Sequence, residues 1–328
     1  MKTHRLLLAL SIAVLVCIES CGTARPVSQG TYYLIATNVK IPYWQWALAG
    51  LNHAASQLHV KAEMLGPDTY QPRGQHEAFQ RVLSLDPAGI LISVGDRRLM
   101  RADIDSAIAR GIPVFTIDSD AEYSKRLVFV GTDNYKAGLM MGATVEDTLN
   151  GKGNLVVFTM PEQLNLVQRL HGLNDALTGH AGLKVTQVVD MKGDPNVVTD
   201  ITKDMLGKSP GKIDAFICLE AIACPEVADV LSSLKVPGKL VVAMDAEPRT
   251  LDGIKKGLIS ATIAQKPFTM AYVALRMMAD LNESKLGNLD RNWLGSPVSP
   301  VPALVDTGVT LVNNQNVDEY LKESSSAP

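Results

Sequence analysis

The sequence has no excess of either charge, few cysteines and, after its first twenty residues, no long hydrophobic run. The net charge is −3 at pH 7, and neither sign clusters along the chain. No basic face is therefore available for nucleic acid, and no helix-turn-helix precedes the first predicted strand. No apolar stretch beyond residue 18 approaches the roughly 20 residues that a bilayer-spanning helix requires. These absences exclude a nucleic-acid-binding protein and an integral membrane protein.

The long hydrophobic run, residues 6–18, follows a short basic segment and precedes small residues. This arrangement is typical of a signal peptide. Ile18 and Ser20 before Cys21 resemble the lipobox of bacterial lipoproteins, in which the cysteine is acylated and becomes the new N-terminus. We therefore expect a periplasmic or extracytoplasmic protein, held to a bacterial membrane by a lipid on Cys21. A plain secretory signal cut near Ala24 is the alternative.

Cys218 and Cys224 remain after the signal peptide is removed. Export permits a disulfide between them. Two separate buried thiols are the alternative, because a cysteine at the end of a strand commonly behaves as a small apolar residue. No histidine lies close in sequence to either cysteine, so we predict no metal site, and we expect no cofactor.

Two parts of the chain repeat one pattern. Residues 89–118 and residues 214–245 each contain two apolar runs separated by a helical stretch, and they end in Asp118 and Asp245. Short apolar runs bounded by turn residues are typical of strands buried on both faces, and their alternation with helices predicts parallel α/β units. Ligands bind such sheets outside the carboxyl ends of the strands. The repeat therefore predicts two similar halves with a ligand cleft between them.

The rest of the chain continues this alternation. Further strands are predicted at 32–37, 62–65, 127–130, 155–158, 184–189, 259–265 and 305–311. The chain is also longer than a single core usually grows. We predict an α/β fold of two doubly wound parallel-sheet lobes.

Carboxylates and a glutamine at strand ends, with aromatic side chains opposite, suit the recognition of a sugar. A carboxylate accepts hydrogen bonds from neighbouring hydroxyl groups, and arginine donates in a rigid fork. An aromatic face covers the C–H face of a sugar ring.

Five segments together resemble the type I periplasmic sugar-binding proteins of the ribose-binding class. In family order and across almost the whole mature chain, they are PYW (42–44), GIPVFTIDSD (111–120), GTDNYKAG (131–138), RLHG (169–172) and ATIAQKP (261–267). The resemblance implies the receptor of an ATP-driven (ABC) sugar importer, which closes two lobes joined by three crossings on a monosaccharide or related polyol. It also implies a monomer that delivers its ligand to a membrane permease.

The resemblance also implies the ligand contacts. They are Thr37 at the end of the first strand, Tyr43 and Trp44 sandwiching the ring, Asp118 and Asp245 accepting from hydroxyls, Arg169 donating, and Gln265 near the hinge. Ile41, Ser119 and Leu219 stand where the ribose-binding pattern has asparagine, arginine and asparagine, which argues against ribose itself. These three positions and Glu220, beside Leu219, are secondary candidates.

Several of these residues also have structural interpretations. Trp44 lies on the apolar stripe of its predicted helix and can pack in the core. Asp118 can cap a loop or helix, and Thr37 can bond to the backbone. Arg169 can be a solvated helix residue. Asp133 and Asn134 are expected to tie the hinge turn.

The predicted boundaries are a signal peptide at 1–21, a tether at 22–30, a first lobe of 31–133 plus 266–296, a second lobe of 134–265 plus 297–323, and a tail at 324–328. Paired aspartates also permit a glycosidase hypothesis, but the family binds without turnover, so we expect no enzyme. A receptor that docks on a chemoreceptor or histidine kinase is the alternative to a transport protein.

Overall fold

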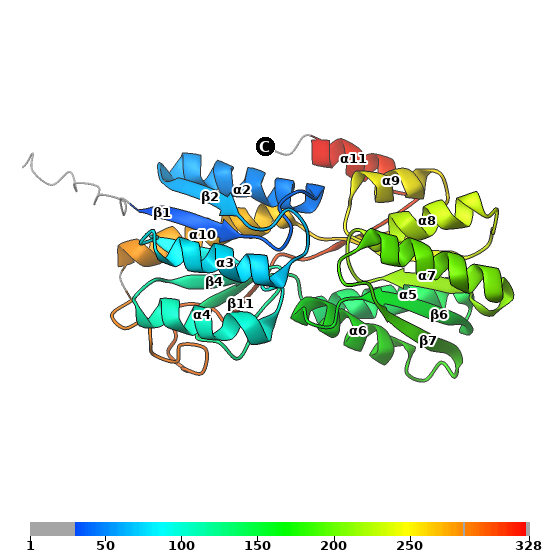
Figure 1. Cartoon of the computed structure of the whole chain (residues 1–328), viewed down its shortest axis with the longest axis horizontal. Coiled ribbons are helices and arrows are strands. Elements are labelled where there is room, and N and C mark those ends of the chain that lie inside the picture. The colour runs from blue at the N-terminus through cyan, green and yellow to red at the C-terminus, as the bar shows by residue number, and fades with distance from the viewer. Residues whose placement is uncertain (1–29, 285, 326–328) are drawn as a thin grey trace, which may run out of the picture.

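The computed structural model describes residues 30–284 and 286–325, which form two α/β lobes side by side (Figure 1). The first sheet contains, in spatial order, β11 (Leu304–Asp306), β5 (Val128–Gly131), β4 (Val114–Ile117), β3 (Gly89–Ile92), β1 (Thr31–Ile35) and β2 (Lys61–Leu65). The second contains β12 (Thr310–Asn313), β10 (Ala261–Ala264), β9 (Leu240–Met244), β8 (Ala215–Cys218), β6 (Lys152–Thr159) and β7 (Gly182–Asp190). The pairs are parallel except β10 with β12. The predicted fold class is confirmed.

Helices flank each sheet (Figure 1). The first lobe carries α2 (Pro42–Leu58), α3 (Pro72–Leu83), α4 (Arg97–Ala109) and α10 (Pro267–Ser284). The second carries α5 (Asn134–Leu149), α6 (Leu164–Leu177), α7 (Pro195–Lys208), the 3₁₀ turn η1 (Pro210–Lys212), α8 (Ala223–Ser233), α9 (Pro248–Lys255) and α11 (Val317–Ser325). The predicted signal peptide, Cys21 and nearly all of the tether lie outside the described residues.

The apolar runs form the central strands, as their sequences predict. Every residue of β3, β4, β8 and β9 is buried. Helices cover both faces of these strands, so they need no polar side, and each lobe has its own hydrophobic core.

The chain passes between the lobes three times. Two passages lie where expected, between β5 and α5 and between β10 and α10. The third passage was predicted near residue 296, and this prediction is wrong. Residues 304–306 pair with β5 in the first sheet, whereas 310–313 pair with β10 in the second. The predicted single strand at 305–311 is therefore two strands, and the chain crosses between Asp306 and Thr310. The predicted tail is shorter as well, because α11 continues to residue 325.

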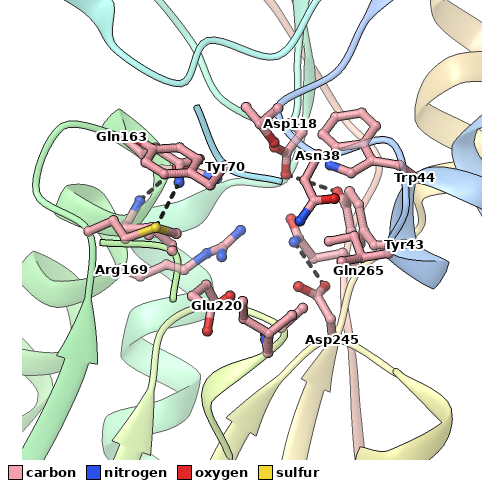
Figure 2. Close-up of a pocket in the computed structure, with 18 residues that line it drawn as sticks. Asn38, Tyr43, Trp44, Tyr70, Asp118, Gln163, Arg169, Glu220, Asp245 and Gln265 are labelled. Carbon is pink, nitrogen blue, oxygen red and sulfur yellow. Dashed lines mark hydrogen bonds between the residues drawn. The ribbon is translucent and has the colours of Figure 1, made fainter. Parts of the chain in front are cut away.

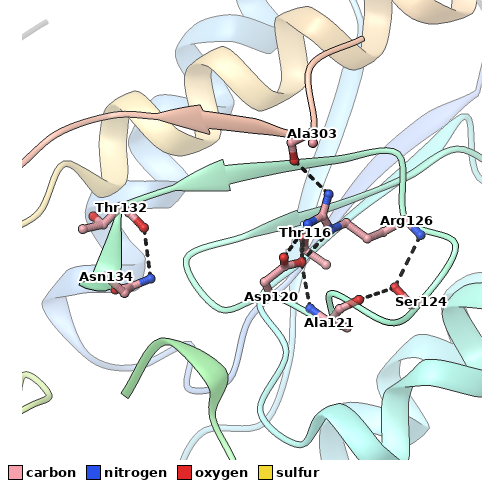
Figure 3. A network of polar contacts seen from close by, with 8 residues as sticks. All are labelled: Thr116, Asp120, Ala121, Ser124, Arg126, Thr132, Asn134 and Ala303. Atoms are coloured by element: carbon pink, nitrogen blue, oxygen red, sulfur yellow. Dashed lines mark hydrogen bonds and ion pairs between the residues drawn. The ribbon is translucent and has the colours of Figure 1, made fainter. Parts of the chain in front are cut away.

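A buried ion pair fixes the segment that leads into β11. Arg126 Nε donates to Asp120 Oδ1 at 2.7 Å, and Arg126 Nη1 donates to the carbonyl oxygen of Ala303 at 2.8 Å (Figure 3). Asp120 also accepts from the Thr116 hydroxyl. Buried charges require such partners. Asp120, although close to Asp118 in sequence, therefore belongs to the framework of the first lobe.

Candidate functional site

The two duplicated aspartates line one pocket between the lobes (Figure 2). Asp118 follows β4, and Asp245 follows β9 in the other lobe. Both have left-handed backbones, with φ of 61° and 69°. Aspartate tolerates this conformation better than most residues, and backbone strain of this kind concentrates at functional sites. The pocket encloses about 510 Å³, its open mouth included.

Asp118 is held by side chains of its own lobe. Its Oδ2 accepts from the Ser93 hydroxyl at 2.7 Å, and its Oδ1 accepts from the Tyr43 hydroxyl at 2.9 Å. The carboxylate is therefore oriented by two donors and does not cap a helix. Each oxygen still has a lone pair that can accept from a ligand.

Asp245 has more accepting capacity to spare. Gln265 Nε2 donates to Asp245 Oδ1 at 2.9 Å and is the one side-chain donor that the described residues supply to this carboxylate; the Gln265 backbone N–H also lowers the pKa of Asp245 by hydrogen bonding. This contact leaves Gln265 Oε1 as a buried acceptor with no protein partner in the described part of the chain. Two neighbouring acceptors suit two neighbouring hydroxyl groups.

Arg169 supplies the main donor of the pocket and is 1% exposed. Its Nε donates to Asn134 Oδ1 at 2.9 Å, and its Nη1 donates to the carbonyl oxygen of Leu219 at 2.7 Å. Its Nη2 is buried and has no partner among the described residues. Gly138 permits this placement, because a Cβ there would lie 2.1 Å from the Arg169 carbonyl oxygen. Arg169 is thus a buried, oriented donor and not a solvated residue.

The rings of Tyr43 and Trp44 do not face each other across a space for a sugar ring, so they do not form the predicted sandwich. Both line the pocket, but their rings meet edge to face at 5.3 Å, with an interplanar angle of 79°. Tyr70 lies on the opposite side of the pocket from Trp44 (Figure 2). Trp44 is 2% exposed, so it also belongs to the core of the first lobe.

The secondary candidates divide into two groups. Ile41 and Glu220 line the pocket, as does Thr37 of the main set, whereas Ser119 and Leu219 are fully buried outside the lining. Leu219 acts through its backbone, because its carbonyl oxygen holds Arg169. Glu220 accepts from the backbone N–H groups of Ile222 and Ala223, at 2.9 and 2.7 Å, and so stabilises the start of α8.

The hinge residues behave as predicted. Asp133 caps α5 by accepting from the Lys136 backbone N–H, and its own N–H donates to Asp306 Oδ1 at 3.2 Å. Asn134 Nδ2 donates to the carbonyl oxygen of Thr132 (Figure 3). The first and third crossings are therefore tied to each other.

Sequence reasoning missed several residues of the site. The additional side chains in the lining include Asn38, Tyr70, Met160, Gln163 and Asn165. A usable signal existed for Asn38 and Tyr70, because both follow predicted strands at the edge where ligands bind. Glu247 was also missed; its Oε1 accepts from the Tyr43 backbone N–H at 2.9 Å, across the cleft.

The acids around the pocket are desolvated. Burial raises the pKa of Asp118, and it raises the pKa of Asp245 to about 6, although Arg169 opposes both shifts. Burial also raises the pKa of Glu220 and of Glu247 to about 7 in each case. Burying a carboxylate disfavours its ionised form. Donors from a polar ligand would offset that cost.

Cys218 and Cys224 form a disulfide, with a Cα–Cα distance of 5.6 Å. It brackets the loop that carries Leu219 and Glu220, and so it braces the backbone that holds Arg169. Within the described ranges, no group of three or more His, Cys, Asp or Glu residues is placed to hold a metal ion. None of the described helices is both long and apolar enough to cross a bilayer.

Two six-stranded parallel-dominated lobes with a buried polar pocket between them define the class of protein. The periplasmic binding protein domain matches residues 32–286. The chain belongs to this family, and within it to the type I periplasmic sugar-binding proteins.

The chain is also similar to individual sugar-binding proteins. The chain is similar to the ribose import binding protein of Bacillus subtilis (strain 168), with 25% identity over 293 residues, covering 87% of this chain and 94% of that protein. A solute-binding protein of an ABC transporter from Burkholderia graminis C4D1M, solved in complex with D-arabinose, matches with a TM-score of 0.81 and 26% identity over 90% of this chain and 98% of that chain. The arabinose-binding protein of Geobacillus stearothermophilus matches with a TM-score of 0.73 and 30% identity, over 89% of this chain and 99% of that chain.

Proposed function

We propose that this protein captures a monosaccharide or related polyol between its lobes and delivers it to the permease of an ABC importer. The observation that carries the proposal is a pair of buried atoms, Arg169 Nη2 and Gln265 Oε1, that have no partner among residues 30–284 and 286–325. A buried polar group without a partner costs about 1–3 kcal/mol. Hydroxyl groups donate and accept at once, so a polyhydroxylated ligand satisfies both atoms.

The geometry also favours a ligand no larger than a single ring. Asp118 and Asp245 approach the pocket from opposite lobes, and Trp44 and Tyr70 bound it at the sides. The named relatives bind ribose and arabinose. We propose binding without chemical turnover.

The test is a thermal-shift screen of the mature protein against pentoses, hexoses, deoxysugars and inositols, followed by isothermal titration of the hits. Saturating ligand at 100 times Kd stabilises a native protein by about 2.7 kcal/mol, so a true ligand raises the melting temperature clearly. An Arg169→Gln variant serves as the binding-defective control. If no compound at millimolar concentration shifts the wild type, the sugar receptor is rejected.

A sensing receptor is the second candidate. One similar solved structure, the XylFII–LytSN complex, places a chain with 28% identity and a TM-score of 0.77 in an assembly with a second protein. Deleting the gene separates the candidates. Loss of uptake at low sugar concentration supports transport, whereas intact uptake with a lost transcriptional or chemotactic response supports sensing.

We further propose that Cys21 carries the lipid anchor, on the basis of Ile18 and Ser20 before it. A Cys21→Ala change should release the protein in soluble form. A mature N-terminus mapped downstream of Cys21 would contradict acylation.

A further inference from the structure

Helix α2 begins without a cap from its own lobe. Ile41 occupies the N-cap position and its side chain makes no capping hydrogen bond. The first-turn N–H groups of a helix have no partner inside the helix. One of them, the Tyr43 N–H, is satisfied from the second lobe, where Glu247 Oε1 accepts at 2.9 Å. This contact joins residues 204 positions apart, in a groove that Gln265 and Lys266 of the second crossing also line.

Glu247 is well placed for this contact. It precedes Pro248, the first residue of α9, and it is 8% exposed. It also lies two residues after Asp245, which faces the pocket. Its partner Tyr43 donates through its hydroxyl to Asp118. The contact therefore links the loops that carry the two ligand-facing aspartates.

We propose that Glu247 is a closing residue of this receptor: its side chain caps the first turn of α2 across the cleft and holds the two lobes in the closed form. The proposal rests on the proposed function only in assuming that the lobes move apart. When they do, water solvates Glu247 and the Tyr43 N–H separately. Closing exchanges those contacts for one direct hydrogen bond, which is worth about 2- to 12-fold in the ratio of closed to open protein.

The titration of Glu247 gives this contact a pH dependence with a definite sign. Burial, and secondarily the charge of Asp245, raises the pKa of Glu247 from its ordinary value to about 7 in the closed form. Closing therefore takes up protons: its advantage is full below the ordinary pKa and is lost as the pH rises through about 7. The other titratable groups lining the groove that Glu247 faces are Tyr43, Asp245, Lys266, Tyr320 and Glu323.

The experiment measures the distance between the lobes directly. Spin labels are attached to cysteines introduced at exposed Arg73 on α3 and Asp200 on α7, and the distance distribution is recorded without sugar and with D-arabinose or D-ribose. Glu247→Ala removes the acceptor. Glu247→Gln keeps an acceptor without the charge. Glu77→Gln, at an exposed glutamate on α3, is the matched control.

At pH 5, Glu247→Ala should lower the closed-to-open ratio by about 2- to 12-fold, whereas Glu77→Gln should leave it unchanged. Because the pKa of Glu247 rises from 4.5 to about 7, the wild-type ratio should fall by about 70-fold between pH 5 and pH 8, and Glu247→Gln should weaken that dependence. Identical distance distributions for Glu247→Ala and wild type in every condition overturn the proposal. Sugar binding by the wild type is measured separately by titration, so a failure of the proposed function is distinguishable from a failure of the closing contact.

Discussion

The two aspartates that look equivalent in sequence should respond differently to substitution. Asp118 already accepts from Ser93 and Tyr43, one donor on each carboxylate oxygen. Among the described side chains, Asp245 accepts from Gln265 alone, on Oδ1. We therefore predict that Asp245→Asn weakens sugar binding more than Asp118→Asn does.

Asparagine is the appropriate substitute because both positions have positive φ. Alanine would add backbone strain of about 1–2 kcal/mol and confuse a binding defect with a folding defect, whereas asparagine tolerates the left-handed region. Hydrogen bonds to charged groups contribute roughly 1.5–3 kcal/mol, so Asp245→Asn should raise Kd by about 10- to 150-fold.

Stability should change in the opposite direction to affinity. Burial raises the pKa of Asp245 to about 6, so its ionised form is disfavoured in the folded protein. The stability linked to this group is present below its ordinary pKa and is lost as the pH rises through about 6. At pH 8, ligand-free Asp245→Asn should therefore melt at or above the wild-type temperature.

Isothermal titration with the sugar found by screening, together with melting curves at pH 8, measures both effects. Equal losses of affinity for Asp118→Asn and Asp245→Asn would refute the asymmetry between the two carboxylates. A wild-type Kd for Asp245→Asn would remove that residue from the site. A clear fall in its melting temperature would show that its charge is structural.

Three other changes test the cleft and its supports. Arg169→Gln should raise Kd by at least about 100-fold and lower the free energy of unfolding by about 1–3 kcal/mol, because the guanidinium that donates to Asn134 and Leu219 is lost. Titration measures the first effect and chemical denaturation the second. An unchanged affinity would contradict the assignment of Arg169 to the site. Gly193→Ala should impair binding, because a Cβ there would lie 2.5 Å from Tyr70 Cβ across the cleft. Gly238→Ala, with a similar positive φ and nothing within 4 Å, is its control, and equal affinities would show that Tyr70 does not close on Gly193. The double change Cys218→Ala and Cys224→Ala should cost about 2 kcal/mol of stability in denaturant titrations. It should also weaken sugar binding, because the loop that holds Arg169 loses its brace. Wild-type values for both stability and affinity would mean that the disulfide does not brace the loop.

The sequence was sufficient for the architecture because strand burial is written in local patterns. The runs ending at Asp118 and Asp245 are nearly all apolar, and only strands covered by helices on both faces bury such runs completely. Together with the resemblance, the same edge rule predicted Thr37, Asp118, Asp245 and Gln265, and the structure places all four in one pocket. That they contact a sugar stays a prediction.

The tertiary structure alone decided which lobe each late segment joins and how the site is completed. β11 is short and exposed in part, so its few residues carry no pattern that distinguishes one sheet from the other. Ser119 and Leu219 lie beside predicted contacts in sequence, but the pleat and the turn direct their side chains into the lobes. Glu247 comes from a segment without a motif, and it meets Tyr43 only because the lobes face each other. Contacts between distant segments depend on how two folded bodies pack, and local sequence does not encode that packing.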